Sequence, residues 1–105
     1  MKILAILRPP ENTDVREAIM SHLRQELESL WGLYRTGFVR EMYAPRGPGA
    51  ILVLEADSVA DAQSKLGELP LLSNKIVQLE LIELNPFGAV ERLFAAEPPP
   101  GPTAA

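Results

Sequence analysis

Residues 65–84, KLGELPLLSNKIVQLELIEL, join a helical pattern to a strand-like pattern and decide the fold of this chain of 105 residues. Apolar residues recur at helical spacing up to Leu69, and further on apolar and polar residues alternate, as in a strand with one buried face. Three leucines surround Pro70 at the junction, although turns are usually polar. Because proline disfavours helix at the residue before it, Pro70 is expected to end the helix. We predict that Leu69, Leu71 and Leu72 plug the end of a hydrophobic core at this junction. Lining of a ligand pocket is the alternative role for these leucines.

Outward from this junction, the hydrophobic pattern predicts a strand, a helix, two strands, a second helix and a last strand. The strands are expected over residues 2–8, 37–44, 50–56 and 76–84, and the helices from Val15 to about Tyr34 and from Ser58 to Leu69. This β-α-β-β-α-β order is that of the ferredoxin-like fold, an α+β class in which both helices cover one face of an antiparallel four-stranded sheet.

Local signals mark the ends of these elements. Thr13 or Asp14 is expected to cap the first helix, and Asp14 and Glu17 have the spacing of a capping box. Gly37 stands where a left-handed residue would end that helix. Ser58 is expected to cap the second helix, and the loop PRGPG predicts a hairpin between the two middle strands.

The apolar residues also predict which surfaces are buried. The first helix is expected to bury one stripe, formed by Val15, Ile19, Leu23, Leu27, Leu30 and Tyr34. In contrast, residues 51–54, ILVL, are apolar at consecutive positions and therefore point to both faces of the sheet. Since the helices cover one face, the other needs a partner. We predict a homo-oligomer, at least a dimer, in which two sheets face each other about a two-fold axis.

Composition narrows the classes of function. The net charge is −4 and the ten Lys and Arg are scattered, so nucleic acid is not an expected partner. The chain contains no Cys, which excludes disulfides, thiolate catalysis and zinc–thiolate sites. One His and no tight acidic cluster predict no metal site. The apolar run at the start is too short for a signal peptide or a membrane span, so a cytoplasmic protein without a membrane partner is expected.

The chain is expected to form a single domain over residues 1–96, of which 85–96 are a short extension. A short helix is predicted around Ala89 to Phe94, and Phe87 and Phe94 are expected to be anchored, with another subunit as one surface for them. Residues 97–105, EPPPGPTAA, are predicted to be a mobile Pro-rich tail whose truncation leaves the melting temperature nearly unchanged.

Two segments carry a family resemblance. SVADAQSKLGELPLL, residues 58–72, followed by a strand, resembles the muconolactone isomerase-like group of the dimeric α+β barrel superfamily. In RTGFVREMY, Gly37, Arg40 and Tyr43 fit that group's Gly-x-x-Arg-x-x-aromatic pattern, and Glu26 falls where the group has a glutamate on the first helix. The resemblance covers roughly residues 23–84. It implies a dimeric α+β barrel and a cofactor-independent isomerase that moves a proton on a small carboxylated lactone-like metabolite.

A more distant resemblance is to the YCII-related domain family, which shares the superfamily fold. The opening ILAILRPPE and His22 on the first helix are similar to it. In that family a helix histidine is thought to work with an aspartate in an Asp-Pro-Phe joint. Leu69 occupies the aspartate position here, so the dyad cannot be assembled and His22 lacks that partner.

Six residues are candidates for the implied site. Glu26, His22 and Tyr43 are the candidate catalytic residues, and Arg40, Trp31 and Leu71 are the candidate substrate-binding residues. Partial burial among apolar neighbours would raise the pKa of Glu26 toward the range of a general base near neutral pH. Arg40 can bind a carboxylate through two parallel hydrogen bonds, and Tyr43 or His22 can relay the proton.

Each candidate also has a structural alternative. Glu26 and His22 have the spacing of an ordinary helix-surface pair, Arg40 can form a salt bridge at the strand end, and Trp31 can pack its helix. Strand parity places Arg40 and Tyr43 on opposite faces, so at most one would face a given pocket.

Alternatives also stay open for the protein as a whole. A non-catalytic ligand-binding or assembly module and a cofactor-independent monooxygenase are compatible with the same fold. A pocket with Glu26 at its wall favours an enzyme, whereas an interior filled by leucine favours the module.

Overall fold

The computed structural model describes residues 1–95 and confirms the predicted order of elements. The elements are β1 (Lys2–Arg8), α1 (Arg16–Arg35), β2 (Val39–Tyr43), β3 (Ala50–Glu55), α2 (Val59–Gly67), α3 (Pro70–Ser73), β4 (Gln78–Leu84) and η1, a 3-10 helix (Gly88–Leu93). The strands form one antiparallel sheet in the order β2-β3-β1-β4, which is the ferredoxin-like topology. The predicted tail, residues 97–105, lies outside the described residues.

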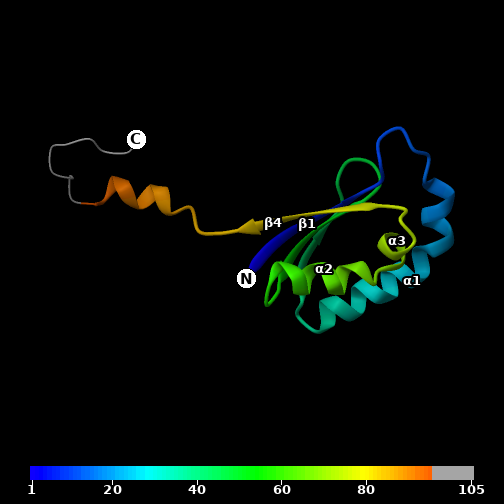
Figure 1. Cartoon of the computed structure of the whole chain (residues 1–105), viewed down its shortest axis with the longest axis horizontal. Helices are drawn as coiled ribbons and strands as arrows, with labels where there is room; N and C mark the ends of the chain where they lie inside the picture. Colours follow the sequence, from blue (N-terminus) through cyan, green and yellow to red (C-terminus); the bar gives the residue numbers. More distant parts are fainter. Residues whose placement is uncertain (96–105) are drawn as a thin grey trace.

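Both long helices lie on the same side of the sheet (Figure 1). Along β1 the side chains alternate, so that Ile3, Ala5 and Leu7 are buried beneath the helices while Leu4 and Ile6 are half-buried on the opposite face. The core is built from β1, β2 and β3, the inner sides of α1 and α2, and the joint before β4. Its largest fully buried side chains are those of Ile3, Leu52, Leu54, Leu66, Leu69 and Val39.

The centre of the opposite face of the sheet is apolar, and no helix of residues 1–95 covers it (Figure 1). Leu4 pairs with Val53 on one side and with Ile82 on the other, and Ile6 pairs with Ile51. The face that these residues form is called the open face below. This arrangement follows from the unbroken apolar run in β3, as the sequence predicts.

The leucine–proline joint forms a short helix, α3, rather than a simple turn. Pro70 is at its first position, where proline needs no N–H partner and its backbone angle suits a helix. Leu69 is 1% exposed, so the predicted plug is confirmed for this residue, while Leu71 and Leu72 are half-buried against the core. Because residues Pro70–Ser73 of the joint form α3, the chain enters the sheet later, and β4 begins at Gln78 and not at Ile76.

The prediction for the buried stripe of α1 was partly wrong. Leu27 is 54% exposed and Tyr34 is 42% exposed, whereas Glu26 is only 4% exposed. Glu26 and Leu30 are one helical turn apart on the buried side of α1. Since an α-helix has 3.6 residues per turn, Leu27 is rotated by about 100° from Glu26 around the helix axis. The packing of α1 therefore places a carboxyl group where the pattern predicted a leucine.

The ends of the helices follow the predicted signals in part. Ser58 caps α2, since its Oγ accepts the Asp61 N–H at 2.9 Å, and Gly37 has the predicted left-handed backbone with φ of 85°. In contrast, Val15 occupies the cap position of α1 and makes no side-chain cap. Asp14 accepts the Arg16 N–H at 3.2 Å from one residue further out. The predicted cap at Thr13 or Asp14 is thus replaced by a weaker contact beside the helix start.

The extension after β4 projects away from the sheet and the helices (Figure 1). Phe87 is 80% exposed and Phe94 is 84% exposed, so neither side chain is packed against the rest of residues 1–95. Within residues 1–95, none of the helices combines the length and the apolar character that a membrane span requires.

Candidate functional site

Glu26 lies in the middle of α1 and faces the joint that precedes β4. Its carboxyl oxygen Oε1 accepts a hydrogen bond of 2.9 Å from the backbone N–H of Leu71. Leu71 follows Pro70 in the first turn of α3, where backbone N–H groups have no partner within the helix. Glu26 thus satisfies an N–H group of one helix from a residue of another, 45 positions earlier in the chain. Of the residues described, it is the only charged one that is buried.

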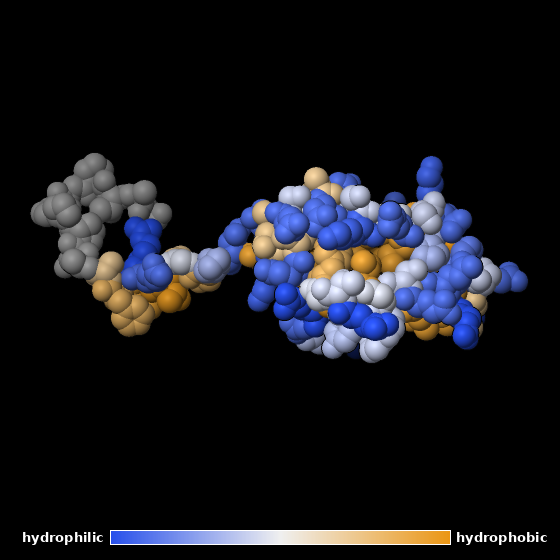
Figure 2. All heavy atoms as spheres, turned by 90° about the horizontal axis from the view of Figure 1, so that it is seen from below, coloured by the Kyte–Doolittle hydropathy of each residue, from blue (hydrophilic) through white to orange (hydrophobic). Residues whose placement is uncertain are grey.

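A cavity of about 160 Å³ lies beside this carboxyl group, between α1, the sheet and the joint. It is called the Glu26 pocket here, and apart from Glu26 every residue that lines it is apolar or glycine, including Leu7, Leu23, Leu30, Leu71 and Val77. Figure 2, which views the helix-bearing side, shows hydrophobic residues between bands of hydrophilic ones. The pocket therefore presents one carboxyl group to an apolar space.

A glycine at one wall of the pocket lets the hairpin loop lie close against the backbone of β1. Gly49 has φ of 132°, and a Cβ atom at this position would lie 2.3 Å from the backbone oxygen of Leu7. Any side chain here would force β1 and the hairpin loop apart. Gly49 was not among the predicted site residues, although a glycine beside a strand is a known signal of close backbone approach.

Burial shifts the pKa of Glu26. Desolvation raises the pKa of this carboxyl group above its usual value of 4.5, because the surroundings disfavour the charged form. The hydrogen bond from Leu71 and the charge of His22 act in the opposite direction but do not cancel the effect on the pKa. A carboxylate with a raised pKa is a stronger base, so this group is suited to accept a proton from a bound molecule.

His22 lies one turn before Glu26 on α1 and is half-buried. Its Nδ1 is 2.9 Å from the carbonyl oxygen of Ala18 and 3.1 Å from Oγ of Ser21. Because a carbonyl oxygen only accepts hydrogen bonds, Nδ1 of His22 is the donor in the contact with Ala18. His22 is therefore held by its own helix through Nδ1, and Nε2 is the other ring nitrogen.

Trp31, Arg40 and Tyr43 do not line the Glu26 pocket. They lie with Tyr34, Glu41 and Met42 around a separate open hollow of about 510 Å³ between the end of α1 and the outer strand β2, called the edge hollow below. The pairing register of β2 shifts between Val39 and Glu41, which marks a β-bulge. Because a bulge interrupts the alternation of side chains, Arg40 and Tyr43 share one hollow, and the parity prediction was wrong.

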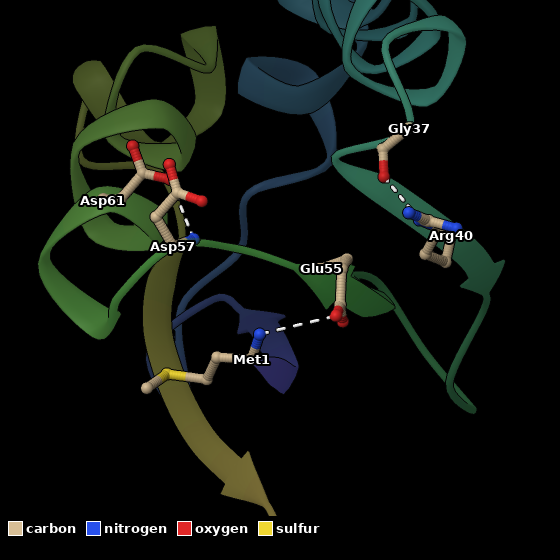
Figure 3. A network of polar contacts seen from close by, with 6 residues as sticks. All are labelled: Met1, Gly37, Arg40, Glu55, Asp57 and Asp61. Carbon is tan, nitrogen blue, oxygen red and sulfur yellow. Dashed lines mark hydrogen bonds and ion pairs between the residues drawn. The ribbon is translucent and has the colours of Figure 1, made fainter.

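Local contacts hold the side chains of the edge hollow. Arg40 turns back toward the end of α1, where its Nε donates a 2.6 Å hydrogen bond to the carbonyl oxygen of Gly37 (Figure 3). The hydroxyl of Tyr43 donates to the Glu41 carboxylate, which raises the pKa of Tyr43 and keeps the phenol protonated. The ring of Trp31 stacks on that of Tyr34, with centroids 5.5 Å apart.

The structure thus joins two of the six predicted site residues directly, Glu26 and Leu71, and His22 lies one helical turn from Glu26 outside the pocket lining. The contact with Leu71 runs through its backbone N–H, whereas the sequence analysis considered its side chain. No group of three or more acidic, His or Cys side chains in residues 1–95 is arranged to hold a metal ion.

Solved structures of other proteins have the same fold as this chain. No protein-family model and no curated protein matches the chain. Among solved structures, the chain is similar to muconolactone isomerase, with a TM-score of 0.63 and 23% identity over 83% of this chain and 93% of the other. The chain shares the fold of muconolactone isomerase. The resemblance predicted from residues 23–84 is confirmed at this level.

A second solved structure has the same fold. It is 5-chloro-2-hydroxyhydroquinone dehydrochlorinase from Burkholderia phenoliruptrix in complex with 2,5-dihydroxybenzoquinone. Its TM-score is 0.63 at 14% identity, over 81% of this chain and 94% of the other. At these identities the similarity to both structures concerns the fold.

Proposed function

We propose that the protein is a cofactor-independent isomerase that transfers a proton on a small carboxylated lactone-like metabolite. The observation that supports this proposal is the buried Glu26 carboxyl group at the wall of an apolar pocket of about 160 Å³. Its Oε1 accepts the Leu71 N–H, so that Oε2 remains to act on a ligand. The raised pKa of Glu26 fits the role of a general base.

The proposed reaction uses Glu26 for both proton transfers. The carboxylate Oε2 removes a proton from a carbon next to the substrate carbonyl, and the electron pair of that C–H bond moves into a double bond of the resulting dienolate. The protonated Glu26 then returns the proton to a different carbon of the same molecule. Substrate and product are isomers, so that no oxidant, reductant or added group enters the balance.

The pocket fits a small ring. Its volume is below the roughly 300–1,000 Å³ of sites for drug-sized ligands. The two proteins of the same fold also involve small ring compounds, a muconolactone by name in one and a bound dihydroxybenzoquinone in the other. In our proposal the apolar wall receives the ring while a carboxylate on the ligand stays at the pocket mouth, outside the apolar space.

A matched pair of variants tests this function. Glu26→Gln keeps the size and the acceptor for Leu71 but removes the base, and Glu28→Gln makes the same change on the same helix at an exposed residue paired with Arg24. Deuterium uptake from D2O next to the carbonyl of small butenolides is followed by NMR. We expect Glu26→Gln to lower the rate by about 10²–10⁴-fold and Glu28→Gln to leave it unchanged. Equal rates in both variants would contradict the proposal.

A ligand-binding or assembly module is the second candidate, because Glu26 also has a structural role. Its hydrogen bond to Leu71 connects α1 to α3 whether or not a substrate binds. In a module, butenolides bind to the wild type and to Glu26→Gln with equal affinity and neither protein catalyses exchange. Calorimetric binding together with the exchange assay separates the two candidates.

We also propose that the protein is a homodimer, or a larger assembly, built through the open face. The centre of this face is apolar, no helix of residues 1–95 covers it, and the outward residues Val53 and Ile82 flank Leu4 there. Val53→Lys places a charge in that contact and is expected to yield monomers in light scattering. A wild-type mass near 11.5 kDa at micromolar concentration would contradict the assembly.

A further inference from the structure

The Glu26 pocket can receive a ring, but it offers nothing to hold a carboxylate. Apart from Glu26 itself, its lining residues are apolar or glycine. A ligand carboxylate placed among them would lose its water without gaining a partner, and the Glu26 carboxylate would repel it. Arg40, which the sequence suggested for this role, lies at the edge hollow and does not line the pocket. An acidic substrate therefore needs another cation.

A second cavity adjoins the Glu26 pocket at the start of α1. It has a volume of about 360 Å³, is called the mouth hollow here, and is lined by Thr13, Asp14, Val15, Arg16, Ile19, Met20 and Pro48. Ile19 lines both cavities, and Pro48 directly precedes Gly49 of the pocket wall. Figure 1 shows the hairpin loop and the segment before α1 at the same end of the molecule. A ligand in the pocket can therefore extend past Ile19 into the mouth hollow.

Arg16 is the cation of this region. The charged residues that line the two cavities are Asp14, Arg16 and Glu26, so Arg16 alone among them is positive. Within residues 1–95 its guanidinium takes part in no ion pair, whereas Arg24 on the same helix is paired with Glu28. Helix stability does not explain its position either, because the first turn of a helix favours acidic side chains. The guanidinium is therefore available to a ligand.

We propose, on the basis of the function proposed above, that Arg16 binds the substrate carboxylate in the mouth hollow while the ring lies in the Glu26 pocket. A guanidinium holds a carboxylate through two parallel charge-assisted hydrogen bonds. The apolar side chains of Ile19 and Met20 line the hollow beside Arg16 and can contact the carbon chain between the ring and the acid. Arg16 is in this way the residue that selects acidic substrates.

The spacing of Arg16 and Glu26 indicates the length of the substrate. Residues 16 and 26 are ten positions apart on α1, which is about 15 Å along the helix axis at 1.5 Å per residue. Helical side chains also lean toward the N-terminus, which directs Arg16 away from Glu26. A carboxylate bonded directly to the ring would stay close to Glu26. We therefore infer that the substrate carries its carboxylate on a side chain of several carbon atoms.

Asp14 has the opposite charge at the same hollow. Its Oδ1 accepts the backbone N–H of Arg16 at 3.2 Å, and its carboxylate is not ion-paired with the guanidinium. A substrate carboxylate bound by Arg16 is repelled by this neighbouring charge. Asp14→Asn keeps the acceptor for the N–H group and removes the charge, so this variant is expected to bind an acid more tightly than the wild type.

Calorimetry with three butenolides tests the site. The first carries a pentanoic acid side chain, the second is its methyl ester, and the third carries the acid directly on the ring. We expect the wild type to bind the first about tenfold more tightly than the other two. Arg16→Gln should abolish this preference without changing the affinity for the ester, and Asp14→Asn should strengthen binding of the pentanoic acid only. Arg24→Gln makes the same change outside both cavities and is expected to behave as the wild type.

The deuterium-exchange assay on the same compounds separates this claim from the proposed function. If the wild type catalyses exchange but binds the acid and the ester equally, or if Arg16→Gln keeps the preference for the acid, the role of Arg16 alone is overturned. A preference that is lost in Arg16→Gln, without exchange in the wild type, supports the carboxylate site and overturns the isomerase. A wild type that binds none of the three compounds overturns both.

Discussion

The Glu26 pocket and the edge hollow hold residues that the sequence suggested as one site, yet they differ in physical character. The pocket lies between α1 and the sheet and surrounds a single carboxyl group with apolar walls. The hollow lies at an outer strand, where Arg40, Glu41 and Tyr43 are exposed. Burial shifts the pKa of Glu26 by desolvation, whereas a neighbouring carboxylate shifts that of Tyr43. The pocket therefore suits the proton transfer proposed above, whereas the edge hollow presents polar and aromatic side chains to solvent.

The largest expected effect is at the joint before β4, behind the residues that line the pocket, where Leu69 belongs to the core. Leu69→Asp places a charge where the side chain is 1% exposed, and we expect a loss of about 4–5 kcal/mol or more in the free energy of unfolding. Ser73→Asp adds the same charge to the exposed end of α3 and serves as the control. Urea denaturation followed by circular dichroism measures both. Similar midpoints for the two variants would refute the view that Leu69 plugs the core.

The next effect concerns the contact between Glu26 and Leu71. Glu26→Ala removes the acceptor of a part-buried N–H and is expected to lower the free energy of unfolding by about 1–3 kcal/mol. Glu28→Ala, at an exposed residue of the same helix, is expected to stay within about 0.5 kcal/mol of the wild type. If the two alanine variants are equally stable in urea, the hydrogen bond has no structural role.

The raised pKa of Glu26 also predicts how stability depends on pH. The folded state binds the proton of this group more tightly than the unfolded state does, so the contribution to stability is fully present below the usual pKa of 4.5. It is lost as the pH rises through the raised pKa of the folded protein. The wild type should therefore lose stability relative to Glu26→Gln over this interval. A difference between the two proteins that grows in the opposite direction argues for a lowered pKa.

The smallest effect is expected in the edge hollow. Tyr43→Phe removes the hydroxyl that contacts Glu41, but both side chains are exposed. Exposed contacts of this kind contribute little, so the free energy of unfolding should change by less than about 0.5 kcal/mol. Proton exchange on butenolides should also be unchanged, because Tyr43 does not line the Glu26 pocket. A large loss of proton exchange in this variant would show that the edge hollow and the Glu26 pocket act as one site.

The fold could be predicted from the sequence because its signals are local. The alternation in β4, the serine cap of α2 and the glycine after α1 each act over a few residues. The plug at Leu69 was also predictable, since proline ends the helix after this residue and burial in the core stabilises a large apolar side chain at that end.

The site could be predicted only in part because its contacts are long-range. Glu26 was identified on α1, but its partner Leu71 is brought to it by the packing of α3 against α1. The rotation of α1 that buries Glu26 and exposes Leu27 depends on that same packing. The bulge at Arg40, which gathers the edge hollow, follows from how β2 pairs with β3 and has no clear signal in the sequence.

The most direct test of the central claim is a titration of the Glu26 carboxyl group in the whole protein. The carboxyl carbon resonance of Glu26, assigned by its loss in Glu26→Gln, is followed by NMR as a function of pH. We expect a midpoint above the usual 4.5, because the pocket desolvates the charged form. A midpoint at or below 4.5 would show that the carboxylate is well solvated or strongly paired, and would contradict a general base in this pocket.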